Sequence, residues 1–143
     1  MDSILKISEA ASLGLHAMVY LAGEEHGRPI SITEIAKKLG VSENHLAKVM
    51  QRLSKASLTG SKKGPKGGVF IKKKPEEITF LEIYEAIEGP LPAGFCLLPK
   101  PVCKPGGCVL GNLLHDVYEL VNKKFGETTL ADFASNKKEE ERK

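Results

Sequence analysis

The stretch from Asn44 to Pro75 reads NHLAKVMQRLSKASLTGSKKGPKGGVFIKKKP. It carries nine basic residues and no Asp or Glu, so all 18 acidic residues lie elsewhere in the 143-residue chain. The net charge of +3 hides this asymmetry. A surface this locally basic suits a polyanion, although a lysine-rich face that is merely solvated would have the same composition. The order of elements within and before the stretch favours the polyanion.

Two short helices joined by a tight turn are predicted here. Ser31-Ile-Thr-Glu34 has the pattern of a capping box and predicts a first helix that ends at Gly40. Ser42 is a suitable N-cap for a second helix over about Glu43–Ala56. Each helix has an inward apolar side, formed by Ile35, Ala36 and Leu39 in the first and by Leu46, Val49, Met50 and Leu53 in the second. Such a pair is typical of a helix-turn-helix motif, whose second helix reads DNA.

A basic hairpin is predicted directly after this motif. Leu58-Thr-Gly60 and residues 62–72, KKGPKGGVFIK, contain two strand-like segments around a Gly/Pro turn. A hairpin in this position is expected to be a wing, whose glycines allow close approach to a duplex and whose lysines neutralise phosphates. The predicted DNA-binding residues are Ser42, Asn44, His45, Lys48, Arg52, Lys62, Lys63 and Lys66.

Helices are predicted on both sides of this motif. Apolar spacing indicates one over about Ile4–Ala22, and Thr79-Phe-Leu-Glu82 is a second capping box that opens a helix to Glu88. Helical spacing returns from Cys108 to about Phe125, and residues 129–133 predict a last short helix. The predicted fold is mainly α. It has a winged helix-turn-helix DNA-binding domain over 1–78, a cysteine loop and dimerisation helix over 79–135, and a disordered tail over 136–143.

The long C-terminal helix is predicted to have an apolar stripe formed by Leu110, Leu113, Leu114, Val117, Leu120 and Val121. This stripe could pack into the core of one monomer. A two-fold homodimer is favoured, because readers of duplex DNA are commonly symmetric dimers on palindromic operators.

Several classes of protein fit this sequence poorly. The longest apolar runs are far shorter than a membrane span, and no charged-then-apolar leader begins the chain, so a cytoplasmic protein without membrane contact is expected. An enzyme or electron carrier is disfavoured because no nucleophile–base set, paired carboxylates or phosphate-binding Gly loop stands out. A basic wing would have no purpose in such a protein.

Three cysteines, Cys96, Cys103 and Cys108, lie in a segment rich in proline and glycine. Such a loop lets three thiolates turn toward one point, which suits an iron–sulfur cluster (2Fe–2S or 4Fe–4S) or zinc. The spacing is not the paired C-x-x-C of common zinc modules, so zinc is the weaker alternative. Free thiols, with or without one reversible disulfide, are the other alternative.

Three cysteines leave a fourth ligand open. His115 is too far along a helix that begins at Cys108, since seven residues span about 10 Å. The remaining candidates are His16, Glu9, Ser12 and Glu119, contributed by the same chain or by a second subunit. A lone histidine on a helix is more often a packing residue than a ligand.

With these motifs in place, the chain resembles the Rrf-two family of bacterial winged-helix regulators. The resemblance covers nearly the whole chain and is carried by the three cysteines and by residues 7–22, 32–58, 64–70, 83–89 and 129–132. The wing motif and the three-cysteine loop together are specific to this family. The resemblance implies a homodimer whose long helix crosses its twin on a palindromic operator.

The resemblance also implies roles for individual residues. Asn44 and His45 match positions that touch base edges, and Lys63 matches one that enters the minor groove from the wing. Ala47 stands where one branch of the family has a base-reading Glu, so the operator of that branch is not expected here.

The cluster-binding members hold iron–sulfur with cysteines that match all three of this chain. Two fourth ligands known in the family are missing, because Gly111 and Ser12 occupy those positions. His16 matches a histidine ligand of a redox-sensing member. The predicted metal ligands are therefore Cys96, Cys103, Cys108 and His16. The predicted function is a transcription regulator, expected to be a repressor, whose operator binding is controlled by an iron–sulfur cluster sensing redox state, nitric oxide or iron–sulfur status. The alternative is a cluster-free regulator controlled by a thiol switch or a partner.

Overall fold

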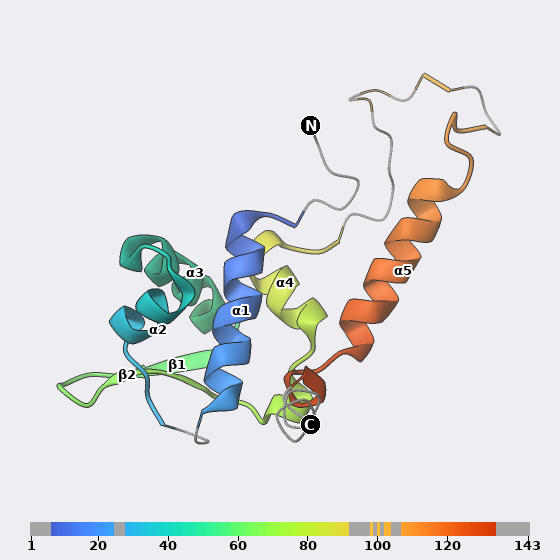
Figure 1. Ribbon diagram of the computed structural model, residues 1–143. Helices are drawn as coiled ribbons and strands as arrows, with labels where there is room; N and C mark the ends of the chain where they lie inside the picture. Colours follow the sequence, from blue (N-terminus) through green and yellow to red (C-terminus); the bar gives the residue numbers. More distant parts are fainter. Residues whose placement is uncertain are drawn as a thin grey trace, which may run out of the picture.

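The computed structural model describes residues 7–24, 28–91, 98, 100, 102–103 and 107–133. These residues form a mainly helical fold with one small two-stranded sheet (Figure 1). The elements in chain order are α1 (Glu9–Gly23), α2 (Ile32–Leu39), α3 (Glu43–Lys55), β1 (Thr59–Lys62), β2 (Gly68–Ile71), a 3-10 turn η1 (Pro75–Glu77), α4 (Phe80–Glu88) and α5 (Leu113–Glu127). The predicted fold class, a winged helix-turn-helix with a long C-terminal helix, is confirmed.

The helix-turn-helix forms because each of its helices has a local start signal. The Ser31 hydroxyl accepts from the Glu34 amide at 3.1 Å, and the Ser42 hydroxyl accepts from the His45 amide at 3.1 Å. Gly40 ends α2 in the left-handed conformation, with φ of 69°. The four apolar residues predicted to face inward on α3, Leu46, Val49, Met50 and Leu53, are all buried.

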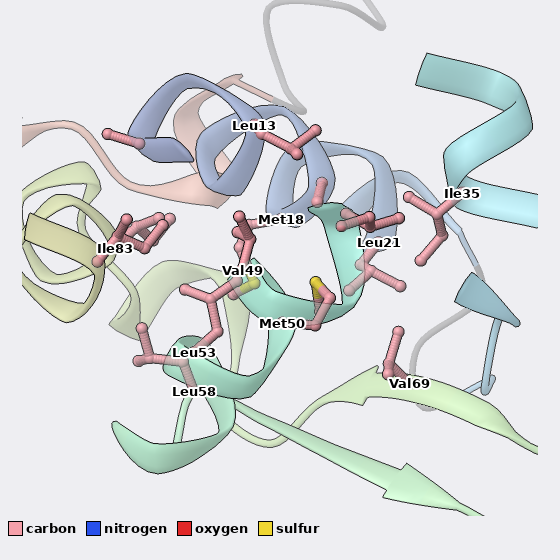
Figure 2. Close-up of a cluster of buried hydrophobic side chains, with 14 of the residues drawn as sticks. Leu13, Met18, Leu21, Ile35, Val49, Met50, Leu53, Leu58, Val69 and Ile83 are labelled. Atoms are coloured by element: carbon pink, nitrogen blue, oxygen red, sulfur yellow. The ribbon is translucent and has the colours of Figure 1, made fainter. Parts of the chain in front are cut away.

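The core lies where α1 meets α3 and α4, with Leu58 and Val69 closing its lower side (Figure 2). Met18, Leu46 and Ile83 are each fully buried within it. Buried apolar side chains supply most of the stabilisation of such a fold, about 25 cal/mol for each Å² removed from water. This shared core holds the exposed face of α3 in a fixed position relative to α1 and α4.

The wing is a two-stranded antiparallel hairpin in which Lys62 lies opposite Gly68. The Ile30 amide donates to the Val69 carbonyl at 2.9 Å and the Val69 amide donates back at 2.8 Å, so the hairpin is attached to the segment before α2. A Cβ at Gly68 would lie 2.3 Å from the Ile30 carbonyl carbon. Only glycine therefore fits at this crossing, and it lets the wing pass close to the backbone before α2.

The C-terminal part returns to this same core. Thr79 and Glu82 form the predicted capping box at the start of α4. The Leu130 amide donates to the Ile78 carbonyl at 3.1 Å, and the Phe80 amide donates to the Thr128 carbonyl at 2.9 Å. The Leu130 side chain is buried in the core. The end of α5 is thereby fastened to the start of α4.

Two predicted helix starts are wrong. Within the described residues the first helix begins at Glu9, and Ile7 and Ser8 before it are not helical, because Ser8 is extended and its hydroxyl accepts from the Ala11 amide at 3.0 Å. The long helix does not begin at Cys108 but at Leu113. Residues 109–112 form turns, in which Gly111 has φ of 60°, a left-handed conformation that interrupts helical geometry.

The predicted tail over 136–143 lies outside the described residues. Among the helices that are described, none combines the length and the hydropathy needed to cross a membrane.

Candidate nucleic-acid interface and cysteine loop

The first turn of α3 presents polar side chains to solvent. Asn44 and Lys48 are exposed, and neither side chain has a hydrogen-bond or ion-pair partner within the described ranges. The Ser42 hydroxyl caps the helix through the His45 amide, which leaves its own proton free to donate. Unpaired amides and ammonium groups at the start of a helix can reach base edges and phosphates without breaking an internal contact.

His45 lies beside Glu9 of α1. Its Nδ1 lies 3.9 Å from Oε1 of Glu9, and 36% of its side chain is exposed. The sequence did not predict this contact, since 36 residues separate the partners. The imidazole is therefore both a predicted base reader and a contact between α1 and α3.

Arg52 differs from the other predicted DNA-binding residues. Its Nη1 donates to the Ile87 carbonyl oxygen at 3.0 Å, near the C-terminal end of α4. Part of its hydrogen-bonding capacity is thus used inside the protein. The remaining donors of the guanidinium group stay available to other acceptors.

The wing supplies the other predicted cations. Lys62, Lys63 and Lys66 are exposed and form no ion pair with any residue that the structure describes. The Gly67 amide donates to the Gly64 carbonyl at 2.9 Å, which closes the turn at the tip. In Figure 1 the hairpin tip extends on the same side of the molecule as α2 and α3. The predicted cations of the wing and the exposed face of α3 thus lie on neighbouring elements.

The cysteine loop lies only partly within the described residues. Cys96 is outside them, while Cys103 and Cys108 are exposed free thiols. The Leu110 amide donates to Sγ of Cys108 at 3.5 Å. Amide donors to sulfur are a common feature around iron–sulfur ligands.

His16 is exposed on α1, and its Nδ1 lies 2.7 Å from the Ser12 carbonyl oxygen. Because a carbonyl can only accept, Nδ1 is the donor here, and in the neutral imidazole the lone pair is then on Nε2. Histidine ligands to metals commonly have this arrangement. His16 lines a hollow of about 230 Å³ together with Glu9, Ser12, Leu13, Leu39 and Val41. The sequence did not predict this hollow, because it forms between α1 and the turn after α2.

The described residues of one chain do not by themselves assemble a metal centre. No three His, Cys, Asp or Glu side chains among them lie close enough together to hold a metal ion. The donor types nevertheless suit a soft metal centre, because two exposed thiols and an imidazole with a free Nε2 are available.

The comparisons with known proteins agree with this architecture. The Rrf2 (Rrf-two) family model, described as an iron-dependent transcriptional regulator, matches residues 7–136. The chain belongs to the Rrf2 family. This Rrf2 protein is 31% identical over 128 residues to an HTH-type transcriptional regulator inferred for Aquifex aeolicus (strain VF5), with 87% of this chain and 88% of that protein covered.

Solved structures of two kinds of regulator are similar to this Rrf2 protein. CymR (YrzC), the global cysteine regulator of B. subtilis, is 32% identical with a TM-score of 0.77 over 92% of this chain and 98% of that one. T. potens IscR is 26% identical with a TM-score of 0.73, and the match covers 92% of this chain and 88% of that one. The oxidised form of Staphylococcus aureus CymR is 28% identical with a TM-score of 0.74 over 91% and 96%.

Family membership confirms the coarse predictions from the sequence. This Rrf2 protein is a transcriptional regulator with a DNA-binding winged helix, and the family, whose members typically bind DNA as dimers, does not consist of enzymes. The DNA contacts, metal ligands and domain boundaries predicted residue by residue remain predictions.

Proposed function

We propose that this protein is a homodimeric repressor that binds a palindromic operator and releases it in response to redox state, nitric oxide or iron–sulfur status. The observation that carries the DNA-binding part is the surface shared by α3 and the wing. That surface presents Lys48, Lys62, Lys63 and Lys66 without an ion-pair partner in the described chain, and it lies within an acid-free stretch. Lysine ammonium groups that are in no salt bridge can neutralise DNA phosphates, and so release their counterions, without first breaking an internal ion pair.

The proposed dimer surface is the outer face of α5. No residue of α5 is buried in the monomer, and the side chains of Leu113 and Leu120 are 45% and 68% exposed. Unburied leucines at helical spacing are costly in water and are typical of an interface between subunits. Two copies of α5 crossing about a two-fold axis would place the two α3 helices on paired half-sites of one duplex.

The proposed control site consists of Cys96, Cys103 and Cys108, with His16 from the same or the second subunit as the fourth ligand. An iron–sulfur cluster bound there would supply sensitivity to oxidants, nitric oxide and iron supply. The protein's part is to hold sulfur and nitrogen donors in position: the Leu110 amide orients Cys108, and the Ser12 carbonyl fixes the His16 tautomer.

The route from this site to DNA runs through α5. Cys108 lies five residues before the first residue of α5. The other end of α5 is anchored, because the Phe125 ring packs against Phe80 and Tyr84, with ring centroids 6.5 and 6.0 Å apart. Rearrangement of the loop would therefore move the free end of α5 about a fixed end and change the spacing of the two reading helices. A coupling of about 1–3 kcal/mol is sufficient for such regulation.

Anaerobic purification followed by a visible spectrum and iron and sulfide counts tests the control site. We expect a coloured protein with iron and sulfide in the wild type and an altered spectrum in His16→Ala. His115→Ala is the matched control, because His115 is also exposed and helical but is not a proposed ligand. A colourless protein without iron would refute the cluster while leaving DNA binding intact.

A cluster-free thiol switch is the second candidate, and it is favoured by the oxidised CymR structure among the similar proteins. The exposed Cys103 and Cys108 thiols would be oxidised in place of ligating metal. Replacement of all three cysteines by Ala distinguishes these cases when operator binding is measured under oxidant, nitric oxide and iron limitation. A response only to oxidant that is lost in the variant supports the thiol switch. An unchanged response supports control by a partner.

A further inference from the structure

Three helices meet at the C-terminal end of α4. Arg52 on α3 donates from Nη1 to the Ile87 carbonyl at 3.0 Å. The Ser8 hydroxyl, which also caps α1, donates to the Glu88 carboxylate. The last turn of α4 is thus fastened both to the end of the recognition helix and to the start of the first helix.

These contacts satisfy groups that a helix end leaves open. The last carbonyls of a helix have no amide partner within it, and their dipoles favour a nearby cation. The Gly89 amide donates to the Glu85 carbonyl at 2.9 Å, and the Arg52 guanidinium donates to the Ile87 carbonyl. Hydrogen bonds that involve a charged group are stronger than those between neutral groups. Arg52 therefore caps α4 from another helix.

The contacts of Arg52 with Ile87 and of Ser8 with Glu88 form a junction that lies close to the cysteine loop in the chain. Gly89 follows with φ of 82°, and the described segment ends at Leu91, five residues before Cys96. The end of α4 is therefore the base of the cysteine loop. The same carbonyl that Arg52 holds lies nine residues before the first cysteine.

We propose that Arg52 is a positioning residue that connects the base of the cysteine loop to the recognition helix, and that it does not contact phosphate. The Ser8–Glu88 contact is the second part of this junction. The inference rests on the proposed function, since it concerns how loop and DNA influence each other. It is an alternative to the prediction that Arg52 is a DNA-binding residue.

Salt dependence tests the DNA side of this proposal. The probe is a duplex selected by the full-length wild-type protein from a random-sequence pool. Loss of a phosphate contact lowers the slope of log affinity against log salt by about 0.9 per site. We expect Lys48→Gln to lower the slope and Arg52→Gln to leave it at the wild-type value. Lys55→Gln is the matched control, because it removes one charge from an exposed position in the same helical turn.

Hydrogen exchange of the peptide spanning residues 85–91 tests the loop side, because coupling between two sites is reciprocal. In the wild type, bound duplex should slow exchange there at least about fivefold, the lower end of ordinary coupling. Arg52→Gln should abolish the slowing. Glu88→Ala should abolish it as well, although Glu88 is on α4 and outside the proposed DNA surface. Glu85→Ala is the control on the same helix, since its side chain is exposed.

The outcomes separate the two proposals. A wild type that binds no duplex refutes the proposed function itself. Duplex binding with a lower salt slope in Arg52→Gln refutes the positioning role and restores the phosphate contact. Duplex binding with the same slowing of exchange in wild type, Arg52→Gln and Glu88→Ala also overturns it. A slope like that of wild type, together with loss of slowing in both variants but not in Glu85→Ala, is the expected result.

Discussion

Neutralising the wing should weaken DNA binding in a way that salt reveals. Lys62, Lys63 and Lys66 are exposed and unpaired in the described chain, so each is free to contact one phosphate. In a dimer that amounts to about six contacts, each worth about 0.9 in the slope of log affinity against log salt. The triple change to Gln should therefore lower the slope by about five. The advantage of the wild type should be large at low salt and nearly vanish at high salt.

Fluorescence anisotropy with a labelled duplex at several salt concentrations measures this slope. The control protein carries Lys123→Gln and Lys124→Gln, which remove charge from exposed positions of α5. Its slope should match the wild type. The reasoning is refuted if the wing variant, folded by circular dichroism, keeps the slope of the control protein, because its lysines would then be solvated and would not bind phosphate.

Four further changes test other parts of the structure. Asn44→Ala should weaken the binding free energy for the duplex selected by the wild-type protein by about 1–3 kcal/mol, and an equal loss on random DNA would exclude base reading by Asn44. Leu120→Glu should convert dimer to monomer in sedimentation, since it places a charge on the unburied stripe; an unchanged mass would place the interface elsewhere. Leu130→Ala should lower the free energy of unfolding by about 2–4 kcal/mol in urea unfolding, because Leu130 is 1% exposed. Phe133→Ala should lower it much less, because Phe133 is 43% exposed. Burial, with the Glu88 charge, raises the pKa of Tyr84 above 10.0, so stability should fall as pH rises past about 10, and Tyr84→Phe should flatten that fall.

The sign of the tyrosine effect follows from proton binding. When the folded-state pKa is raised, the folded protein keeps its proton at a pH where the unfolded chain has lost it. The stabilisation is complete below the unfolded pKa and is lost as pH rises through the folded value. Unfolding measured from neutral to strongly alkaline pH should therefore show a decline that begins near pH 10. A rise in stability over that range would contradict the burial of Tyr84.

Local signals in the sequence predicted most of the fold. Ser31, Ser42 and Thr79 each cap a helix as expected, because an N-cap hydroxyl needs only the amide three residues later. The inward faces of α2 and α3 were also readable, since helical spacing alone decides which side chains share a face. The start of α5 was mispredicted where no such signal exists, because Asn112 makes no capping hydrogen bond through its side chain. The start of α1 was mispredicted although Ser8 caps it, because the apolar spacing continues ahead of the cap.

The sequence by itself determined the helix-turn-helix, the wing and the concentration of positive charge along them, because those depend on neighbours a few residues apart. Only the tertiary structure decided what several polar side chains do. Arg52 reaches a carbonyl 35 residues away, and His45 meets Glu9 on another helix. The stripe of α5 stays outside the core of the monomer, since no residue of α5 is buried. Such outcomes depend on the packing of distant segments, and no local pattern in the acid-free stretch contains them.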